Sequence, residues 1–374
     1  MTGNKAQGTI ELSKPPGRIS GNDAADGPPL GRRVFRLRNV VSFLLALAVL
    51  FLVSRQLLSL DWREAWASLR GASAGLFALA LVIFYCSFPL RALRWGTLLG
   101  NVGYDRASGH PMPSTFGLTR IMYLAWFANC VTVARLGDAY RGYLLKRASG
   151  VSFAVTLGTV LAERLLDLLV LAVLMGAGVL VVFGGSLPTA TAQALAAGLI
   201  LSAVGIVGLL SMRHFRWTFE KVLPKRLQAH YVHLEHGVIG SFKRLPQLVA
   251  YSVIGWVIEG MTLYLVAESV SAPVSVAGAV VIALAASLLT AVPITPAGLG
   301  FTEAGMVVML QWLGLDLPTA TAITLLFRII NYWSIVVLGF FLYVFARNIG
   351  QLDEERSGTP GAPIRIHKLF TGRS

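Results

Sequence analysis

The sequence predicts an all-α polytopic membrane protein with about six full transmembrane helices and two re-entrant broken-helix hairpins arranged as an inverted repeat. Three observations predict this fold. Of the 374 residues, 55% are hydrophobic and only 13% are charged, whereas a soluble domain carries about 25% charged residues. Apolar runs long enough to cross a bilayer recur along the chain. A short motif also occurs twice, and an arginine inside an apolar segment follows each copy.

The repeated motif has nearly the same spacing in both copies. The first copy, ARLG, ends at Gly137, and Arg164 follows that glycine by 27 residues. The second copy, AGLG, ends at Gly300, and Arg328 follows it by 28 residues. A hydrogen-bonding residue lies three positions after each arginine: Asp167 and Asn331. Repeated broken-helix units are typical of membrane transporters.

The full transmembrane helices are expected at six apolar runs. Residues 40–53 follow a cluster of arginines and precede no small-residue cleavage site, so they are expected to form a retained first helix rather than a signal peptide. Five further runs are long enough to cross at about 20 residues per bilayer: 74–95, 151–183, 192–211, 247–269 and 318–346.

Two other apolar stretches, 117–149 and 274–316, are interrupted by residues that permit tight turns or end helices. The residues expected to form these re-entrant turns are Gly137, Asp138, Pro293, Pro296, Gly298 and Gly300. Two acids that follow the turns, Asp138 and Glu303, are equally suited to cap the next half-helix or to contact a ligand. The repeat units therefore span about 117–183 and 274–346.

The distribution of basic residues predicts the orientation. The net charge is +14, and basic residues gather in the N-terminal tail and in residues 91–116, 135–149 and 212–246. The positive-inside rule places these segments, and both chain ends, in the cytoplasm. The first hairpin then enters from the cytoplasm and the second from outside, so the repeats are inverted. Broken backbone at membrane depth needs protein or water around it, which predicts a polar cavity between the repeats.

The membrane domain is expected to cover residues 36–347, between disordered tails at 1–35 and 348–374 that are rich in Gly and Pro or charge. Outside the membrane flanks no basic stretch is interleaved with aromatic residues, so nucleic acid is not an expected partner.

Charged groups inside a bilayer are costly and mark polar paths or ligand sites. The candidate substrate-binding residues are polar side chains at or near the breaks and in the spans: Arg164, Arg328, Glu163, Asp167, Arg135, Glu303, Glu259 and Asn331. Arginine suits a phosphate because its planar charged group donates paired hydrogen bonds. Arg164 and Arg328, which follow the two copies of the motif, are called the repeat arginines. Glu163, Asp167 and Glu259 are expected to balance their positive charges. In the alternative interpretation, these charges form a buried network that only fixes helix register.

Other polar residues receive simpler interpretations. Arg91 and Arg94 end the second predicted span and are expected to anchor it at the membrane interface. The series His230, His233 and His236 is expected to form the solvated face of an amphipathic helix rather than a metal site. No metal is therefore expected, and no cofactor either, because the sequence contains no P-loop or dinucleotide-binding fingerprint.

Four segments resemble the flippase-like family named for the transmembrane region of lysylphosphatidylglycerol synthase: RALRW (Arg91 to Trp95), NCVTVARLGDAYR (Asn129 to Arg141), ERLLD (Glu163 to Asp167) and PITPAGLGFTE (Pro293 to Glu303). The resemblance covers roughly residues 38–346. It implies a multi-pass protein of the bacterial or archaeal cytoplasmic (inner) membrane with re-entrant helices. The best-understood members move aminoacylated phosphatidylglycerol between leaflets, and others accompany glycolipid, polyprenyl-linked sugar or hopanoid biosynthesis.

The chain departs from the family in two respects. Val133 and Asp138 stand where the first break has a proline and a glutamate, and Ala297 replaces a glycine of the second break. Bifunctional members also carry a soluble aminoacyl-transferase domain after the membrane part. Only about 28 residues follow residue 346, so we do not expect this chain to make lysyl-lipid by itself.

The leading functional hypothesis is translocation of a phospholipid or lipid-linked head group across the cytoplasmic membrane through the polar cavity. A transporter without catalytic residues is favoured over an enzyme, although the sequence leaves that question open. One alternative is an intramembrane glycosyl or polyprenyl-phosphate transferase with Glu163 or Glu303 as general base. Another is a non-catalytic partner of an envelope glycolipid or hopanoid synthesis enzyme. The expected partners are thus a phospholipid or polyprenyl-linked lipid, the membrane and an envelope lipid-synthesis enzyme.

Topology reporters test the predicted orientation. Reporters fused at positions 20, 145, 230 and 360 should all give a cytoplasmic signal, and reporters at 66, 188 and 315 an external one. Immunoblots of each fusion control for expression. An external signal at position 145 would rule out the first re-entrant hairpin and the inverted repeat with it.

Overall fold

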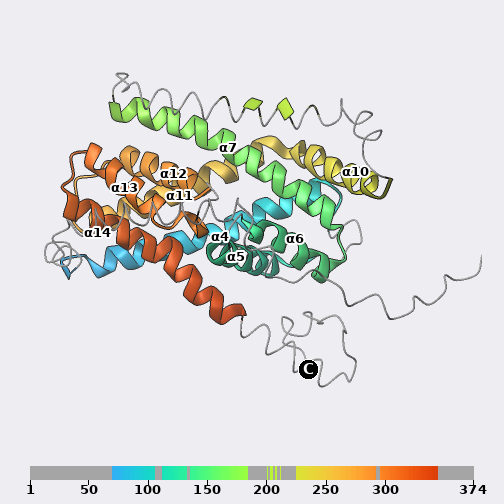
Figure 1. Cartoon of the computed structure of the whole chain (residues 1–374), viewed down its shortest axis with the longest axis horizontal. Helices are drawn as coiled ribbons and strands as arrows, with labels where there is room; N and C mark the ends of the chain where they lie inside the picture. Colours follow the sequence, from blue (N-terminus) through green and yellow to red (C-terminus); the bar gives the residue numbers. More distant parts are fainter. Residues whose placement is uncertain are drawn as a thin grey trace, which may run out of the picture. The chain divides into compact units, whose positions relative to one another are not determined.

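The computed structural model describes residues 70–105, 112–132, 135–183, 225–291 and 295–343, with isolated positions between 200 and 211. All of these lie in one compact unit, Ala46–Ser374. Every regular element in this part of the chain is helical and none is a strand (Figure 1). The predicted all-α class is therefore confirmed.

Four helical stretches are long and apolar enough to cross a membrane: Ala74–Asn101, Phe153–Val182, Tyr231–Ser269 and Leu317–Tyr343. They correspond to α4 (Ala74–Asn101), α7 (Phe153–Phe183), the run of α10 (Lys225–Gly240), η1 (Ser241–Arg244) and α11 (Leu245–Ser269), and α14 (Leu317–Arg328) with η3 (Ile329–Trp333). These stretches confirm four predicted spans. The predicted helix at 40–53 lies outside the described residues, and so does 192–211 apart from isolated helical positions.

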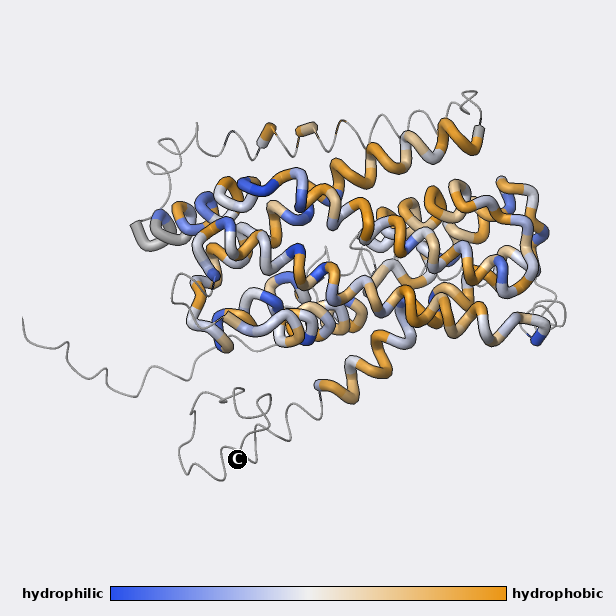
Figure 2. The backbone as a smooth tube through the Cα atoms, turned by 180° about the vertical axis from the view of Figure 1, so that it is seen from behind, coloured by the Kyte–Doolittle hydropathy of each residue, from blue (hydrophilic) through white to orange (hydrophobic). Residues whose placement is uncertain are grey.

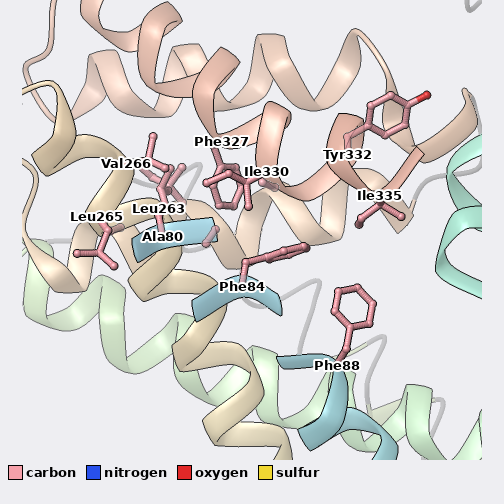
Figure 3. Close-up of a cluster of buried hydrophobic side chains, with 14 of the residues drawn as sticks. Ala80, Phe84, Phe88, Leu263, Leu265, Val266, Phe327, Ile330, Tyr332 and Ile335 are labelled. Atoms are coloured by element: carbon pink, nitrogen blue, oxygen red, sulfur yellow. The ribbon is translucent and has the colours of Figure 1, made fainter. Parts of the chain in front are cut away.

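Helices α4 and α11 form an antiparallel pair at the centre of the fold. At one end the Ser73 N–H donates to the Ser269 carbonyl at 2.7 Å, and at the other end Asn101 Nδ2 donates to the Ser241 carbonyl at 2.7 Å. Between these ends, Figure 3 shows a buried apolar cluster contributed by α4, α11 and the α14–η3 region. Its labelled members are Ala80, Phe84, Phe88, Leu263, Leu265, Val266, Phe327, Ile330, Tyr332 and Ile335.

Both predicted helix breaks are present. Helices α5 (Thr115–Val131) and α6 (Leu136–Ser149) pack together as a hairpin around the first break. Helices α12 (Val276–Ala291) and α13 (Phe301–Trp312) form a second hairpin, with the short helix η2 (Pro296–Gly298) between them. Each hairpin is followed by a long span, α7 or α14, that packs against its second arm. The same order of elements thus occurs twice, and α5 contacts η2, so the two breaks are neighbours.

Polar residues are unevenly distributed over the bundle. Figure 2 shows hydrophobic residues along most of the helices, with hydrophilic positions more frequent where α6 and α10 lie. That region carries Lys146, Arg147, Lys243 and Arg244.

Helices α7 and α10 cross with their backbones in contact. A Cβ atom at Gly158 would lie 2.9 Å from the Gly237 Cα and would overlap the Leu234 carbonyl oxygen. A Cβ atom at Gly237 would lie 3.0 Å from the Gly158 Cα and would overlap the Val155 carbonyl oxygen. Small residues allow this close approach, which is a common way for helices to associate in membranes.

The crossing should not tolerate a side chain. We expect Gly158→Leu to destabilise the protein by about 1–3 kcal/mol, because the helices must separate. Gly176→Leu is the matched control on the same helix, since nothing lies within 4 Å of its Cβ position. Thermal unfolding of the purified proteins in detergent measures the difference. Equal melting temperatures for the two variants would show that the backbones do not touch at this crossing.

Candidate functional site

A cavity of about 270 Å³ lies between the two helix breaks. Thr132 and Arg135 line it from the first break, and Thr295 and Ala297 line it from the second. The remaining polar and aromatic lining residues come from the surrounding helices: Arg91, Trp126, Asn129, Cys130, Arg164, Asp167, Trp256, Glu259, Ser287, Thr290, Arg328, Asn331 and Tyr332. The cavity therefore lies where the sequence predicts one.

Most of the predicted substrate-binding residues meet in this cavity. Those that line it are Arg135, Arg164, Asp167, Glu259, Arg328 and Asn331. Glu163 and Glu303 are not in the lining, but each binds an arginine of the surrounding network. Residues separated by nearly 200 positions in the sequence are thus brought to one polar space.

In the first repeat, Arg164 of α7 forms a bidentate ion pair with Asp138 in the first turn of α6. Arg164 Nε donates to Asp138 Oδ2 at 3.1 Å, and Nη2 donates to Oδ1 at 2.8 Å. The side chains are 28% and 19% exposed, respectively. Asp138 therefore holds Arg164 in place and leaves Nη1 without a hydrogen bond to any described residue.

The second repeat contains the equivalent pair. Arg328 of α14 donates from Nε to Glu303 Oε1 at 2.7 Å, and Glu303 lies in the first turn of α13. Arg328 Nη2 also donates to the Ala297 carbonyl at 3.3 Å, and its guanidinium lies 4.8 Å from the Tyr332 ring centroid. Glu303 Oε2 accepts the Gly300 N–H at 2.7 Å, so this acid caps its half-helix as well as binding the arginine.

The two pairs correct part of the charge assignment made from the sequence. Glu163, Asp167 and Glu259 were expected to balance Arg164 and Arg328 but bind other arginines instead. The acids that follow the two turns, Asp138 and Glu303, balance the charges of Arg164 and Arg328 instead. In both repeats the acid and the arginine are separated by nearly the same number of residues, 26 between Asp138 and Arg164 and 25 between Glu303 and Arg328.

Arg94 of α4 binds both Glu163 and Asp167, two of the acids that were expected to balance Arg164 and Arg328. It donates to both carboxylate oxygens of Asp167 and from Nη2 to Glu163 Oε1 at 2.7 Å. Arg141 Nη2 donates to the other Glu163 oxygen at 2.7 Å, and its guanidinium lies 3.8 Å from the Trp95 ring centroid. These charged side chains are 1–7% exposed. This cluster of ion pairs connects α4, α6 and α7, and Glu163 lies outside the cavity lining.

Arg91 also differs from expectation. Helix α4 continues to Asn101, so Arg91 and Arg94 do not end it as expected, and both arginines are buried. Arg91 Nη2 donates to Glu259 Oε2 at 2.9 Å, and Glu259 Oε1 accepts the Ser287 hydroxyl at 3.2 Å. The Arg91 guanidinium lies 4.7 Å from the Trp126 ring centroid and 5.7 Å from that of Trp256.

Sequence reasoning thus missed five residues around the cavity: Arg91, Arg94, Arg141, Trp126 and Trp256. The sequence did contain a signal that Arg91 and Arg94 lie within a helix rather than at its end. The apolar run after RALRW continues through Leu99, so the helix had no reason to end at Trp95. Nothing in the spacing of the two tryptophans indicated that they would meet.

The turns use left-handed backbone in both breaks. Arg135 has φ 52° and Ala297 has φ 46°, and both are residues for which this conformation is unfavourable. Gly298 and Gly300 have φ 67° and 83°, a conformation that glycine adopts readily. Pro296 begins η2, whereas Pro293 lies outside the described residues.

Gly137 is constrained in a different way from Gly300. It is not among the described residues with positive φ, and it lies in the first turn of α6. A Cβ atom there would overlap the Ala125 carbonyl oxygen and the Asn129 side chain, and its N–H donates to Asn129 Oδ1 at 2.8 Å. The glycine is therefore needed for close approach of α5 and α6.

The three histidines of the series His230, His233 and His236 lie on α10. In the part of the chain that the structure describes, no group of three or more His, Cys, Asp and Glu residues is placed to hold a metal ion. His233 and His236 are exposed on α10, as expected for a solvated face. The side chain of His230 lies outside the described set.

Comparison with known proteins gives a consistent assignment. Residues 39–339 match the family described as the lysylphosphatidylglycerol synthase TM region. A UPF0104 membrane protein of Methanocaldococcus jannaschii is 34% identical over 227 residues, which cover 60% of this chain and 96% of that protein. A second UPF0104 membrane protein, from Methanothermobacter thermautotrophicus, is 27% identical and covers 75% of this chain and 86% of its own length.

Another relative is larger. Glycosyltransferase AglD of Haloferax volcanii is 27% identical over 332 residues, which cover 78% of this chain but only 51% of that protein. This chain therefore matches about half of its length. The family match extends over most of the spans and both helix breaks. The chain belongs to the lysylphosphatidylglycerol synthase transmembrane region family of multi-pass membrane proteins.

Proposed function

We propose that the protein translocates a phospholipid or lipid-linked head group across the cytoplasmic membrane, with the acyl or polyprenyl chains remaining in the bilayer. One observation carries this proposal. Arg164 and Arg328, one from each repeat, line the same cavity, and an acid of the adjoining half-helix orients each of them.

Moving a charged head group across the bilayer meets a large free-energy barrier. A charged phosphate in hydrocarbon loses its hydration, which costs several kcal/mol or more. The cavity replaces water with preorganised arginine donors, and arginine is the side chain best suited to paired hydrogen bonds with phosphate. Arg164 and Arg328 each use two nitrogens for protein contacts. Their remaining Nη1 groups are suited to bind a phosphate between the repeats.

The volume of the cavity is suited to binding a head group rather than a whole lipid. Its volume of about 270 Å³ lies just below the range of about 300–1,000 Å³ that is typical for pockets of small molecules. The chains of a lipid would therefore stay outside. The ion pairs Arg164–Asp138 and Arg328–Glu303 connect each hairpin to the following span, so movement of either hairpin would move one arginine of the site.

A second candidate function has one observation in its favour, the similarity to part of glycosyltransferase AglD. A transferase would need a free general base near the substrate. The candidate bases Glu163 and Glu303 are outside the lining and bind arginines, and the lining acids Asp167 and Glu259 also bind arginines. These contacts favour a non-catalytic role, as the partner of a separate synthesis enzyme, over catalysis by this chain. Product formation by the purified protein from a lipid-linked sugar would favour catalysis.

Neutral substitutions of the two repeat arginines should remove transport. We expect Arg164→Gln and Arg328→Gln each to lower lipid translocation in reconstituted vesicles at least about tenfold, since a hydrogen bond to a charged group contributes about 1.5–3 kcal/mol. The measurement is chemical reduction of fluorescent lipid in the outer leaflet of the vesicles.

The control separates binding from packing. In the double variant Asp138→Asn with Arg164→Gln, neither partner is left as an unpaired charge, so the protein should keep a melting temperature near that of the wild type and still fail to transport. Arg94→Gln should instead lower the melting temperature, because breaking a buried pair costs about 3–5 kcal/mol. Full transport by the double variant would contradict a phosphate-binding role for Arg164.

Cysteine labelling tests access to the cavity from the two breaks. In a background with Cys86→Ser and Cys130→Ser, cysteines at Thr132 and Thr295 should both react with a small polar thiol reagent, because both positions line the cavity. In cells the reagent should reach position 132 preferentially from the cytoplasm and position 295 from outside. A bound phospholipid should protect both.

An exposed position on the same protein, such as Leu136→Cys, serves as the reactivity control because it is outside the cavity lining. Labelling of positions 132 and 295 from the same side, regardless of lipid, would contradict access to the cavity from opposite sides of the membrane. Protection of Leu136→Cys to the same extent would show that the lipid shields the whole surface rather than the cavity.

A further inference from the structure

The charges around the cavity do not cancel. Three of the lining arginines each bind an acid: Arg91 with Glu259, Arg164 with Asp138 and Arg328 with Glu303. The fourth lining arginine is Arg135, whose backbone carbonyl accepts the Asp138 N–H at 3.1 Å. Its guanidinium group forms no hydrogen bond or ion pair with any residue that the structure describes. It contributes a positive charge to the lining without a matching acid.

The remaining charges nearby are balanced among themselves. Asp167, which lines the cavity, binds Arg94, and Glu163 binds both Arg94 and Arg141. This group therefore holds two arginines and two acids. Within the described residues, the cavity and the side chains that bind its lining carry a single uncompensated positive charge, located at Arg135. An unpaired charge in a low-dielectric site is costly, so an anionic ligand with one charge would complete the site.

Unpaired polar atoms in the lining indicate a second property of the ligand. Arg91 Nε and Trp256 Nε1 are buried donors without a hydrogen-bond partner, and Asn331 Oδ1 is a buried acceptor without one. All three residues line the cavity. Buried polar atoms in native proteins are nearly always satisfied, by protein, water or ligand. A hydroxyl group can both donate and accept, whereas an ammonium group only donates and would leave both nitrogen donors unsatisfied.

We propose that the head group bound in this cavity is a phosphodiester with one negative charge that carries uncharged hydroxyl groups, and that Arg135 selects for that charge. This inference rests on the proposed function, because it names the substrate class of the same cavity. A phosphomonoester carries a charge of about −1.5 to −2 at neutral pH and would overcompensate Arg135. A zwitterionic head group has no net charge and would leave Arg135 uncompensated.

Two kinds of lipid share this chemistry: a glycerophospholipid with a glycerol head group, and a polyprenyl phosphate that carries a sugar. In both, the phosphate is esterified on two sides and the distal group presents hydroxyls. A binding experiment with one lipid of each kind distinguishes between them.

The test measures binding to the purified protein in detergent, by native mass spectrometry with short-chain lipids. We expect phosphatidylglycerol to bind at least about tenfold more tightly than phosphatidylcholine, the scale on which a desolvated charge pair changes affinity, and more tightly than phosphatidic acid. A polyprenyl phosphate glucose is the second phosphodiester. The phosphodiester that displaces the other at lower concentration is the source of the head group.

Variants at Arg135 test its role in selection. Arg135→Gly should lower the preference for phosphatidylglycerol over phosphatidylcholine to about one, whereas Arg135→Lys should retain it. Because residue 135 has φ 52°, glycine relieves backbone strain, so the melting temperature of Arg135→Gly should equal or exceed that of the wild type. Lost selectivity in a protein that is no less stable distinguishes ligand contact from a structural role.

Equal binding of phosphatidylglycerol and phosphatidylcholine by the wild-type protein would overturn the inference, and that result does not require any variant to fold. Unchanged selectivity in Arg135→Gly would also overturn it. Translocation is measured separately in vesicles with the same lipids. Transport without charge selectivity would leave the proposed function standing and contradict this inference. Arg135-dependent binding without any transport would contradict the proposed function and support this inference.

Discussion

The structure depends on one constraint: an arginine buried in a membrane protein is costly unless an opposite charge compensates it. Apart from Arg135, each arginine of the cavity lining binds a carboxylate from another helix. These contacts also fix which helices are neighbours, since a buried charge without its partner is strongly destabilising. The Arg94 cluster joins α4 to α7, the Arg91 pair joins α4 to α11, and the two repeat pairs hold the half-helices α6 and α13 against the spans that follow them.

Much of the fold follows from the sequence because membrane helices need long apolar runs, and broken helices need glycine or proline. The spans at α4, α7, α11 and α14 and both breaks were predictable for these reasons. The end of α4 was not, because arginines in an apolar run were interpreted as a helix end. In the structure Arg91 and Arg94 are buried in ion pairs, which removes the energetic reason to place them at an interface.

The candidate site was predictable in its members but not in its pairings. Charged residues in apolar spans identified Arg164, Arg328 and Glu259, because charge in hydrocarbon is rare. Which acid binds which arginine depends on helix rotation and crossing, and the sequence contains no direct record of either. Asp138 and Glu303 therefore emerge as the partners of the repeat arginines only in three dimensions. The aromatic contacts of Arg91 with Trp126 and Trp256 are hidden from the sequence for the same reason.

The central claim is that one cavity between the breaks binds a lipid phosphate through an arginine from each repeat. An experimental structure determined in lipid nanodiscs with phosphatidylglycerol tests this claim most directly. The account predicts a phosphate between Arg164 and Arg328, with oxygens at about 2.7–2.9 Å from guanidinium nitrogens and with the acyl chains leaving the cavity toward the bilayer. Lipid bound only on the outer faces of the helices, with the arginines paired solely to Asp138 and Glu303, would contradict it.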